Sequence, residues 1–172
     1  MNNWVCSMKI NEILDGIKTQ LKTQFPELKT CEIHDGRFDV SELKRVSTKT
    51  PAMHISVLGL PMSSDQSTEE VNVDASLVIY VITSDQPKLS KGESARNLVE
   101  ALIPTVSHQR WGVMQTGKAE SINAQNLFNS TANHGIALWA VTWRQNLTIG
   151  SEPEQESFMP AELYVDGVQI NE

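Results

Sequence analysis

The stretch of sequence that decides the fold is VNVDASLVIYVIT, residues 71–83. Its first half alternates apolar residues with polar ones, as in Val71-Asn72-Val73-Asp74, and its second half is apolar almost throughout. Strict alternation indicates a strand with one buried face, and a continuous apolar run indicates a strand buried on both faces. We therefore predict a long strand at the centre of a sheet.

Further strands are predicted on both sides of this one. A short strand is expected over residues 30–35, one with period-two alternation over Met53–Leu60, and a long one from His134 to Ile149. The polar stretch Met62–Glu70 is expected to be a loop. Residues 111–128 are ambiguous: residues 112–114 are compatible with a strand, and the Ala, Ser, Asn and Gln content that follows indicates a loop or weak helix.

Two helices are predicted from apolar residues spaced three and four apart. The first runs over Lys9–Gln24 and stops before Pro26, and the second lies around Ser94–Ile103 and ends at Pro104 or a turn beyond. Ser41 is a candidate N-cap for a brief helical turn through Lys44. The fold class expected is α+β, a mixed and mostly antiparallel sheet packed against two main helices.

Charge is distributed unevenly along the chain. The net charge is −7, yet residues 151–172 hold six acids and no Lys or Arg, which leaves residues 1–150 almost neutral. We therefore expect a folded unit over residues 1–150, in which residues 1–7 are a loose extension, and an acidic extension over 151–172. No basic cluster suited to phosphates is present, so specific nucleic-acid binding is not expected.

Targeting features are not found in the sequence. The first nine residues have neither a basic region nor the apolar run of a secretory signal, and no stretch has about 18 consecutive apolar residues. We expect no membrane association, and a cytoplasmic or virion location. Cys6 and Cys31 are expected to be reduced.

Motifs that carry chemistry fail on inspection. Cys31 and His34 have a C-x-x-H spacing, but a tetrahedral metal site needs four ligands and no second pair matches. Ser94 lacks the second glycine of a nucleophile elbow. The carboxylates of Asp65, Glu69 and Glu70 share a loop and are expected to be solvated. We predict no catalytic residues, no metal and no cofactor.

Histidines are the remaining candidates for catalysis. His54 is expected on the polar face of its strand and His108 at a helix end, both as surface or interface residues. An enzymatic alternative would need a deep pocket with His54 or His134 beside a carboxylate.

Candidate interface residues lie in the last third of the chain. Trp139 and Trp143, four residues apart on one strand, point to the same face, where core packing is the default and a subunit interface the alternative. Asp166-Gly167 between apolar residues is a hairpin signal. The candidate interface set is Trp139, Trp143, Phe158, Tyr164, Val165, Val168 and Ile170. The hairpin either adds strands to a neighbouring subunit's sheet edge or packs on its own domain.

Five predicted elements follow one another in this order: the helix Lys9–Gln24 with Phe25-Pro26 after it, the strands Met53–Leu60 and Val71–Thr83, the helix around Ser94–Ile103 and the strand Ile136–Gln145. This order resembles that of a family of Mu-like phage and prophage tail proteins. This family is similar to the tail terminators of long-tailed phages. The resemblance covers roughly residues 8 to 150 and rests on the order of the elements.

The resemblance implies a structural subunit rather than an enzyme. Its copies would form a homo-oligomer, expected to be a hexameric ring, that terminates the tail tube and joins it to the head connector. Tail tube, sheath and connector proteins are then the expected partners. A monomeric binding or regulatory module is the main alternative, and an enzyme of another type is a further one.

Overall fold

The computed structural model describes residues 9–38, 48–65, 70–127 and 135–150, together with the backbone of two short strands near the C-terminus. The predicted turn at Ser41 lies outside these residues. In chain order the elements are α1 (Lys9–Gln24), β1 (Thr30–Ile33), β2 (Ala52–Gly59), β3 (Met62–Asp65), β4 (Val71–Ser84), α3 (Lys91–Val106), β5 (Glu120–Asn126), β6 (Ile136–Ile149), β7 (Tyr164–Val165) and β8 (Val168–Gln169).

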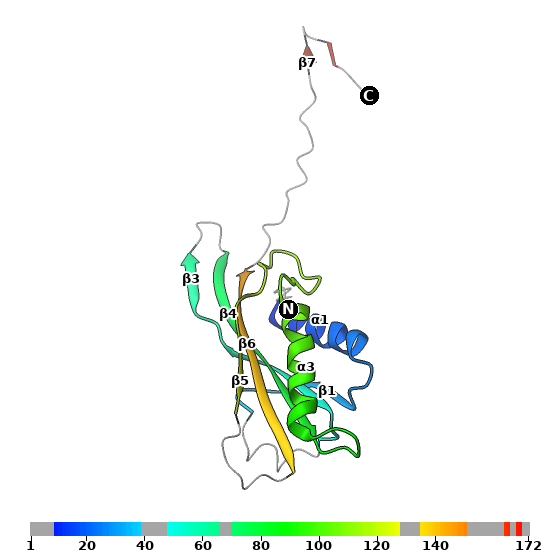
Figure 1. Ribbon diagram of the computed structural model, residues 1–172. Helices are drawn as coiled ribbons and strands as arrows, with labels where there is room; N and C mark the ends of the chain where they lie inside the picture. Colours follow the sequence, from blue (N-terminus) through cyan, green and yellow to red (C-terminus); the bar gives the residue numbers. More distant parts are fainter. Residues whose placement is uncertain are drawn as a thin grey trace, which may run out of the picture.

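The body is a six-stranded mixed sheet in the order β1-β2-β4-β6-β5, with β3 paired to β4. Only β1 and β2 are parallel, and every other pair in this sheet is antiparallel. Strands β4 and β6 pair along their whole 14-residue lengths and form the spine of the sheet (Figure 1). The predicted α+β class and the central position of β4 are confirmed.

Both helices pack on one face of the sheet. Helix α1 lies against β1 and β2, and α3 lies against β4 and β6 (Figure 1). The aliphatic stripe of α1 is buried through Ile13, Leu14, Ile17 and Leu21, and each such side chain contributes about 1.5–3 kcal/mol on burial. No helix in the described part of the chain is long and apolar enough to cross a membrane.

Helix α3 begins earlier than its apolar pattern predicts. Ser90 is the N-cap and its hydroxyl accepts from the Glu93 backbone N–H, while the Lys91 N–H donates to Asp85 at 2.9 Å. These acceptors satisfy first-turn N–H groups, so the helix starts at Lys91. Pro104 lies inside its last turn, and the helix ends two residues later at Val106, within the predicted range.

Among the described residues, apolar side chains cover the second face of the sheet at one end. There Phe38 packs on a small apolar cluster that includes Val78, Tyr80, Leu138 and Ala140. His54 belongs to this end and is 3% exposed, so the prediction that it lies at the surface is wrong. The reason is tertiary, because the segment before Phe38 folds back over a face that alternation alone marks as polar.

Two predictions for polar stretches are also corrected. Residues 62–65 form strand β3, not a loop, because they pair with the start of β4 in a hairpin. Residues 120–126 form strand β5 beside β6, whereas residues 112–114 lie in turns. In both cases partner strands supply the backbone hydrogen bonds, and this overrides the weak strand preference of Ser and Asn.

Candidate functional site

The half of the second sheet face that the Phe38 cluster leaves uncovered is polar, and we call it the open face. It consists of Asn72, Asp74 and Ser76 on β4 and Thr142, Arg144, Asn146 and Thr148 on β6. These residues alternate along their strands with core residues such as Ala75, so they point away from the helix layer. The open face therefore lies on the side of the sheet opposite both helices.

Hydrogen bonds between strands fix the polar side chains at one end of the open face. The Asn146 amide donates to Asp74 Oδ1 at 3.0 Å and to Ser63 Oγ at 3.2 Å. The Thr148 hydroxyl donates to Asn72 Oδ1 at 2.7 Å. These bonds hold β3, β4 and β6 in register, so this end of the open face is a rigid polar surface.

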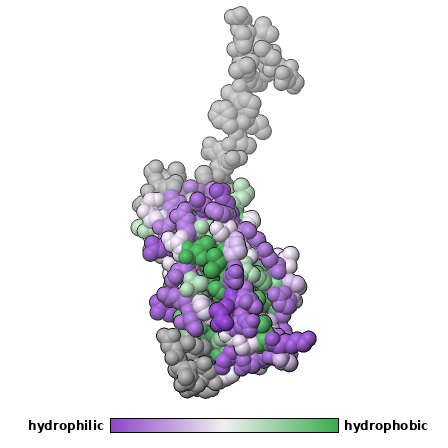
Figure 2. Space-filling view, viewed as in Figure 1, coloured by the Kyte–Doolittle hydropathy of each residue, from purple (hydrophilic) through white to green (hydrophobic). Residues whose placement is uncertain are grey.

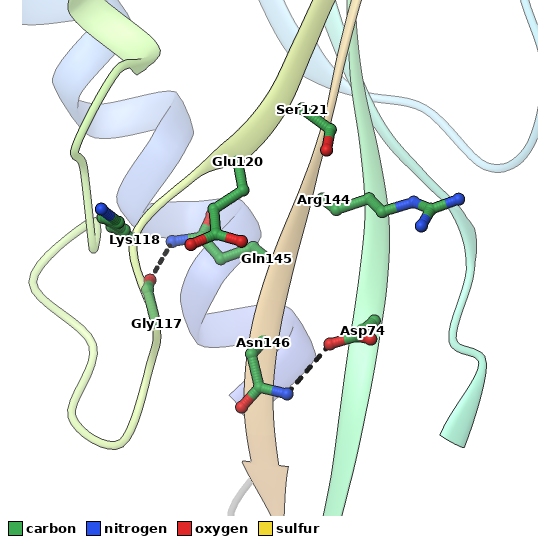
Figure 3. A pocket seen from close by; sticks show the side chains of 8 residues that line it. All are labelled: Asp74, Gly117, Lys118, Glu120, Ser121, Arg144, Gln145 and Asn146. Carbon is green, nitrogen blue, oxygen red and sulfur yellow. Dashed lines mark hydrogen bonds between the residues drawn. The ribbon is translucent and has the colours of Figure 1, made fainter. Parts of the chain in front are cut away.

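A shallow pocket of about 220 Å³ lies where the open face meets β5 (Figure 3). Its lining residues are Asp74, Gly117, Lys118, Glu120, Ser121, Arg144, Gln145 and Asn146. Figure 3 shows Arg144 extending across β4, away from Glu120. Within the described residues neither Arg144 nor Lys118 forms an ion pair. A second groove shares Ser121 and Arg144 with this pocket and continues toward Leu58. The guanidinium of Arg144 is thus an exposed positive charge near the middle of the open face.

Strand β5 is the most open edge of the sheet. Among the described strands, only β6 pairs with it. After a bulge between Glu120 and Asn123, four consecutive residues, Asn123–Asn126, pair regularly with β6. Ser121–Asn126 contains no Lys, Arg or Pro, the residues that commonly protect sheet edges. Among the described strands, Ser121–Asn126 is therefore a candidate edge for an added strand.

The other edges are better protected. Strand β1 has only four residues, and its Glu32 accepts a hydrogen bond from Lys18 of α1 at 2.5 Å. This hydrogen bond lowers the pKa of Glu32. Strand β3 also has four residues and carries a bulge between Met62 and Ser64. Both strands are shorter than the seven residues of β5, and short or charged edges resist pairing with another chain.

Gln145 anchors the segment 107–119, which leads into β5, onto the sheet. Its amide oxygen accepts from the indoles of Trp111 at 2.9 Å and Trp143 at 3.0 Å. Its amide nitrogen donates to the carbonyls of Gln109 at 2.9 Å and Gly117 at 2.8 Å. Sequence reasoning missed this residue, although a signal exists: Gln145 is the polar exception in the apolar series of β6.

Helix α1 also touches this segment. A Cβ placed on Gly16 would lie 2.5 Å from the carbonyl oxygen of Trp111. Such a distance is shorter than a van der Waals contact allows, so glycine is required for the close approach of helix and segment. Both the Gly16 contact and the Gln145 bonds hold the residues that precede β5.

His54 lies in an aromatic cluster rather than in a pocket. Its ring stacks on Phe38 at 4.9 Å between centroids, and Nε2 lies 3.4 Å from the Thr48 hydroxyl. Burial lowers the pKa of His54, His34 lowers it further, and Glu32 acts in the opposite direction. Within the described residues no carboxylate is hydrogen bonded to His54. His108 is exposed just beyond α3, and His134 lies outside the described residues.

Cys31 and His34 lie in different surroundings. Cys31 is buried in the core, and this burial raises the pKa of its thiol. His34 instead contacts Phe38, with ring centroids 5.0 Å apart. The described residues contain no group of three or more His, Cys, Asp or Glu that suits a metal ion. Glu69 and the side chain of Asp65 lie outside the described part of the chain.

The candidate interface residues are divided by the structure. Trp143 is 2% exposed and lies in the core on the helix side, and Trp139 is half-buried and packs against this core, as the default interpretation predicted. Trp143 therefore has almost no surface to offer a partner. The predicted hairpin is present as the antiparallel pair β7 and β8. Phe158, Ile170 and the side chains of β7 and β8 lie outside the described residues.

Apolar side chains are exposed at a few places on the body. Figure 2 shows a mostly hydrophilic face interrupted by a compact hydrophobic patch. Among the exposed large apolar residues, Leu58, Leu60 and Met62 follow one another along the end of β2 and the start of β3, and Leu127 follows β5 directly. These residues border the open face and the β5 edge.

No protein-family model matches the chain, and no curated protein matches it. The fold, the open face and the β5 edge are therefore the features that bear on function.

Proposed function

We propose that this protein is a structural subunit of a phage or prophage tail, whose copies assemble into a ring that terminates the tail tube and joins it to the head connector. The resemblance noted in the sequence motivates this assignment. It requires a subunit with a stable core and surfaces that contact other copies and tail proteins. Cytoplasm of a bacterial host and the virion are the locations that this role implies.

The observation that best supports the proposal is the edge at β5, where Asn123–Asn126 pair regularly with β6 and carry no Lys, Arg or Pro. The strand is bound to the body through its pairing with β6, yet its outer side has no partner among the described strands. Edges of this kind are templates for pairing with another chain, and soluble monomers usually block them. A ring of identical subunits that pair head to tail would cover each of these edges.

Two further features support a structural role. The sheet, with helices on a single face, leaves a rigid polar surface of cross-strand hydrogen bonds available for contact with tail proteins. The Gln145 anchor and the Gly16 contact stabilise the segment before β5, so the edge is presented in a fixed position. Preorganisation of a contact surface lowers the cost of assembly.

The mass of the native assembly tests the proposal. Full-length protein is examined by native mass spectrometry and by negative-stain microscopy, alone and with purified tail tubes. We expect a closed ring of about six copies, either free in solution or at one end of the tubes. A monomer of 19.1 kDa at high concentration that also fails to bind tube ends would refute the proposal. It would favour a monomeric binding module.

A further inference from the structure

We propose that the outer edge of β5 binds residues 163–170 of a second copy, which add to the sheet as a hairpin. This inference depends on the proposed ring, because the ring supplies the second copy. It names the contact that holds neighbouring subunits together.

The two-stranded hairpin needs another strand or a packed face to be stable. Its strands β7 and β8 pair Tyr164 with Gln169 and Val165 with Val168, and they contain two residues each. An isolated two-stranded hairpin is marginally stable in water, and a third strand or a packed face is needed for stability. Addition to an existing sheet edge meets this need.

The pattern of the hairpin complements the β5 edge. Side chains alternate along a strand, so the sequence predicts Val165 and Val168 on one face of the paired hairpin and Tyr164 and Gln169 on the other. The β5 edge likewise has an apolar side and a polar side: Ile122 and Ala124 pack at the margin of the core, and Gln125 is exposed. An added hairpin would place its valines beside the core margin and its polar residue beside Gln125.

Charge and length are both compatible with this contact. The extension carries six acids and no bases, and Ser121–Asn126 carries no charge, so the regular part of the edge does not repel it. Twelve residues, 151–162, separate Gly150 from the hairpin. An extended segment of that length reaches about 40 Å, which is enough to pass the edge of its own sheet.

A pair of matched substitutions in the full-length chain tests which face of the hairpin is needed for binding to β5. Val168→Asp places a charge on the aliphatic face, and Gln169→Asp places the same charge on the adjacent position of the opposite face. Native mass should fall to that of the monomer for Val168→Asp and stay that of the ring for Gln169→Asp. An intact Val168→Asp ring would overturn this inference and leave the ring proposal standing.

A crosslinking experiment tests the strand and the copy that bind. In a Cys6→Ser, Cys31→Ala background, a mass-tagged chain with Gln125→Cys is mixed with an untagged chain with Gln169→Cys and oxidised. We expect a covalent heterodimer, and none from the control that pairs Gln24→Cys with Gln169→Cys. A link that forms only within a chain carrying both cysteines would overturn the assignment to a second copy. If neither arrangement gives a link and the protein still forms rings, binding of the hairpin at β5 is refuted and the ring proposal still stands.

Discussion

Replacement of Gln145 gives the sharpest test of how this structure is held together. In Gln145→Leu the side chain keeps its approximate size but loses every hydrogen bond. The indole N–H groups of Trp111 and Trp143 then have no acceptor, and the carbonyls of Gln109 and Gly117 lose a donor. The segment 107–119 would lose its side-chain hydrogen bonds to β6 and keep only backbone bonds such as that from the Gly117 N–H to the Asn146 carbonyl.

The size of the stability loss in Gln145→Leu depends on which polar groups remain buried without a partner. Trp111 is 5% exposed and Trp143 is 2% exposed, so neither indole N–H can readily turn to water. Each buried donor left without a partner costs about 1–3 kcal/mol. The two carbonyls are only partly buried and can accept from water, and the apolar leucine recovers about 1–2 kcal/mol. We expect a net loss of about 2–4 kcal/mol in the free energy of unfolding.

Gln145→Glu separates the hydrogen-bond argument from a simple packing argument. One carboxylate oxygen can still accept from both indoles, but the other faces two carbonyl oxygens where an amide N–H₂ stood. Burial and this repulsion should raise the pKa of the new carboxyl above about 4.3 in the folded state. The variant should be close to its most stable below that pH and lose stability as pH rises through the folded pKa.

Urea unfolding followed by far-ultraviolet circular dichroism, at one protein concentration, measures these changes. Gln24→Leu, at an exposed position at the end of α1, is the matched control and should change stability by less than about 0.5 kcal/mol. A Gln145→Leu protein within about 0.5 kcal/mol of the wild type would refute the reasoning. So would a Gln145→Glu protein whose loss relative to wild type does not grow between pH 4 and pH 7.

Three other substitutions test separate parts of the structure. Gly16→Ala should destabilise the protein by about 1–3 kcal/mol, despite the better helix propensity of alanine, because its Cβ would collide with the Trp111 carbonyl; thermal unfolding should show a lower Tm. Gly92→Ala, where the nearest atom is a flexible arginine tip at 3.5 Å, is its control and should leave Tm equal or higher. Glu32→Gln should cost less than about 1 kcal/mol in urea unfolding, because the ion pairs of Glu32 are exposed, and a larger loss that persists in high salt would contradict this. Burial lowers the folded pKa of His54, so the wild type should lose stability as pH falls below about 6.5, and His54→Phe should lose less. If stability falls with pH at the same rate in both proteins, His54 is not the origin of this pH dependence.

Several elements were predictable because their signals are local. The α1 stripe and the alternation in β4 and β6 each repeat over many residues, and their burial follows from periodicity alone. The hairpin at β7 and β8 was predicted from Asp166-Gly167, since this dipeptide suits a tight turn. Of the candidate interface residues, sequence reasoning also gave the core as the default position of Trp143.

Strands β3 and β5 and the burial of His54 depend on residues distant in the sequence. The backbone of Ser121–Asn126 becomes a strand only because β6 supplies its hydrogen bonds, and β6 begins after the connection that follows Leu127. His54 is buried because Phe38 stacks on it, a contact that strand periodicity cannot reveal. For the same reason sequence reasoning did not find the open face or the β5 edge.

The sequence by itself determined the α+β class, the two helices, the long central strands and the acidic extension, because hydrophobic periodicity and charge act within a single segment. Only the tertiary structure decided which polar residues are buried and which edge of the sheet stays open. Gln145 shows the physical reason. A polar side chain in the core is stabilised by partners from Gln109 to Gly117 and by Trp143, and those partners come within hydrogen-bonding distance only when the chain has folded.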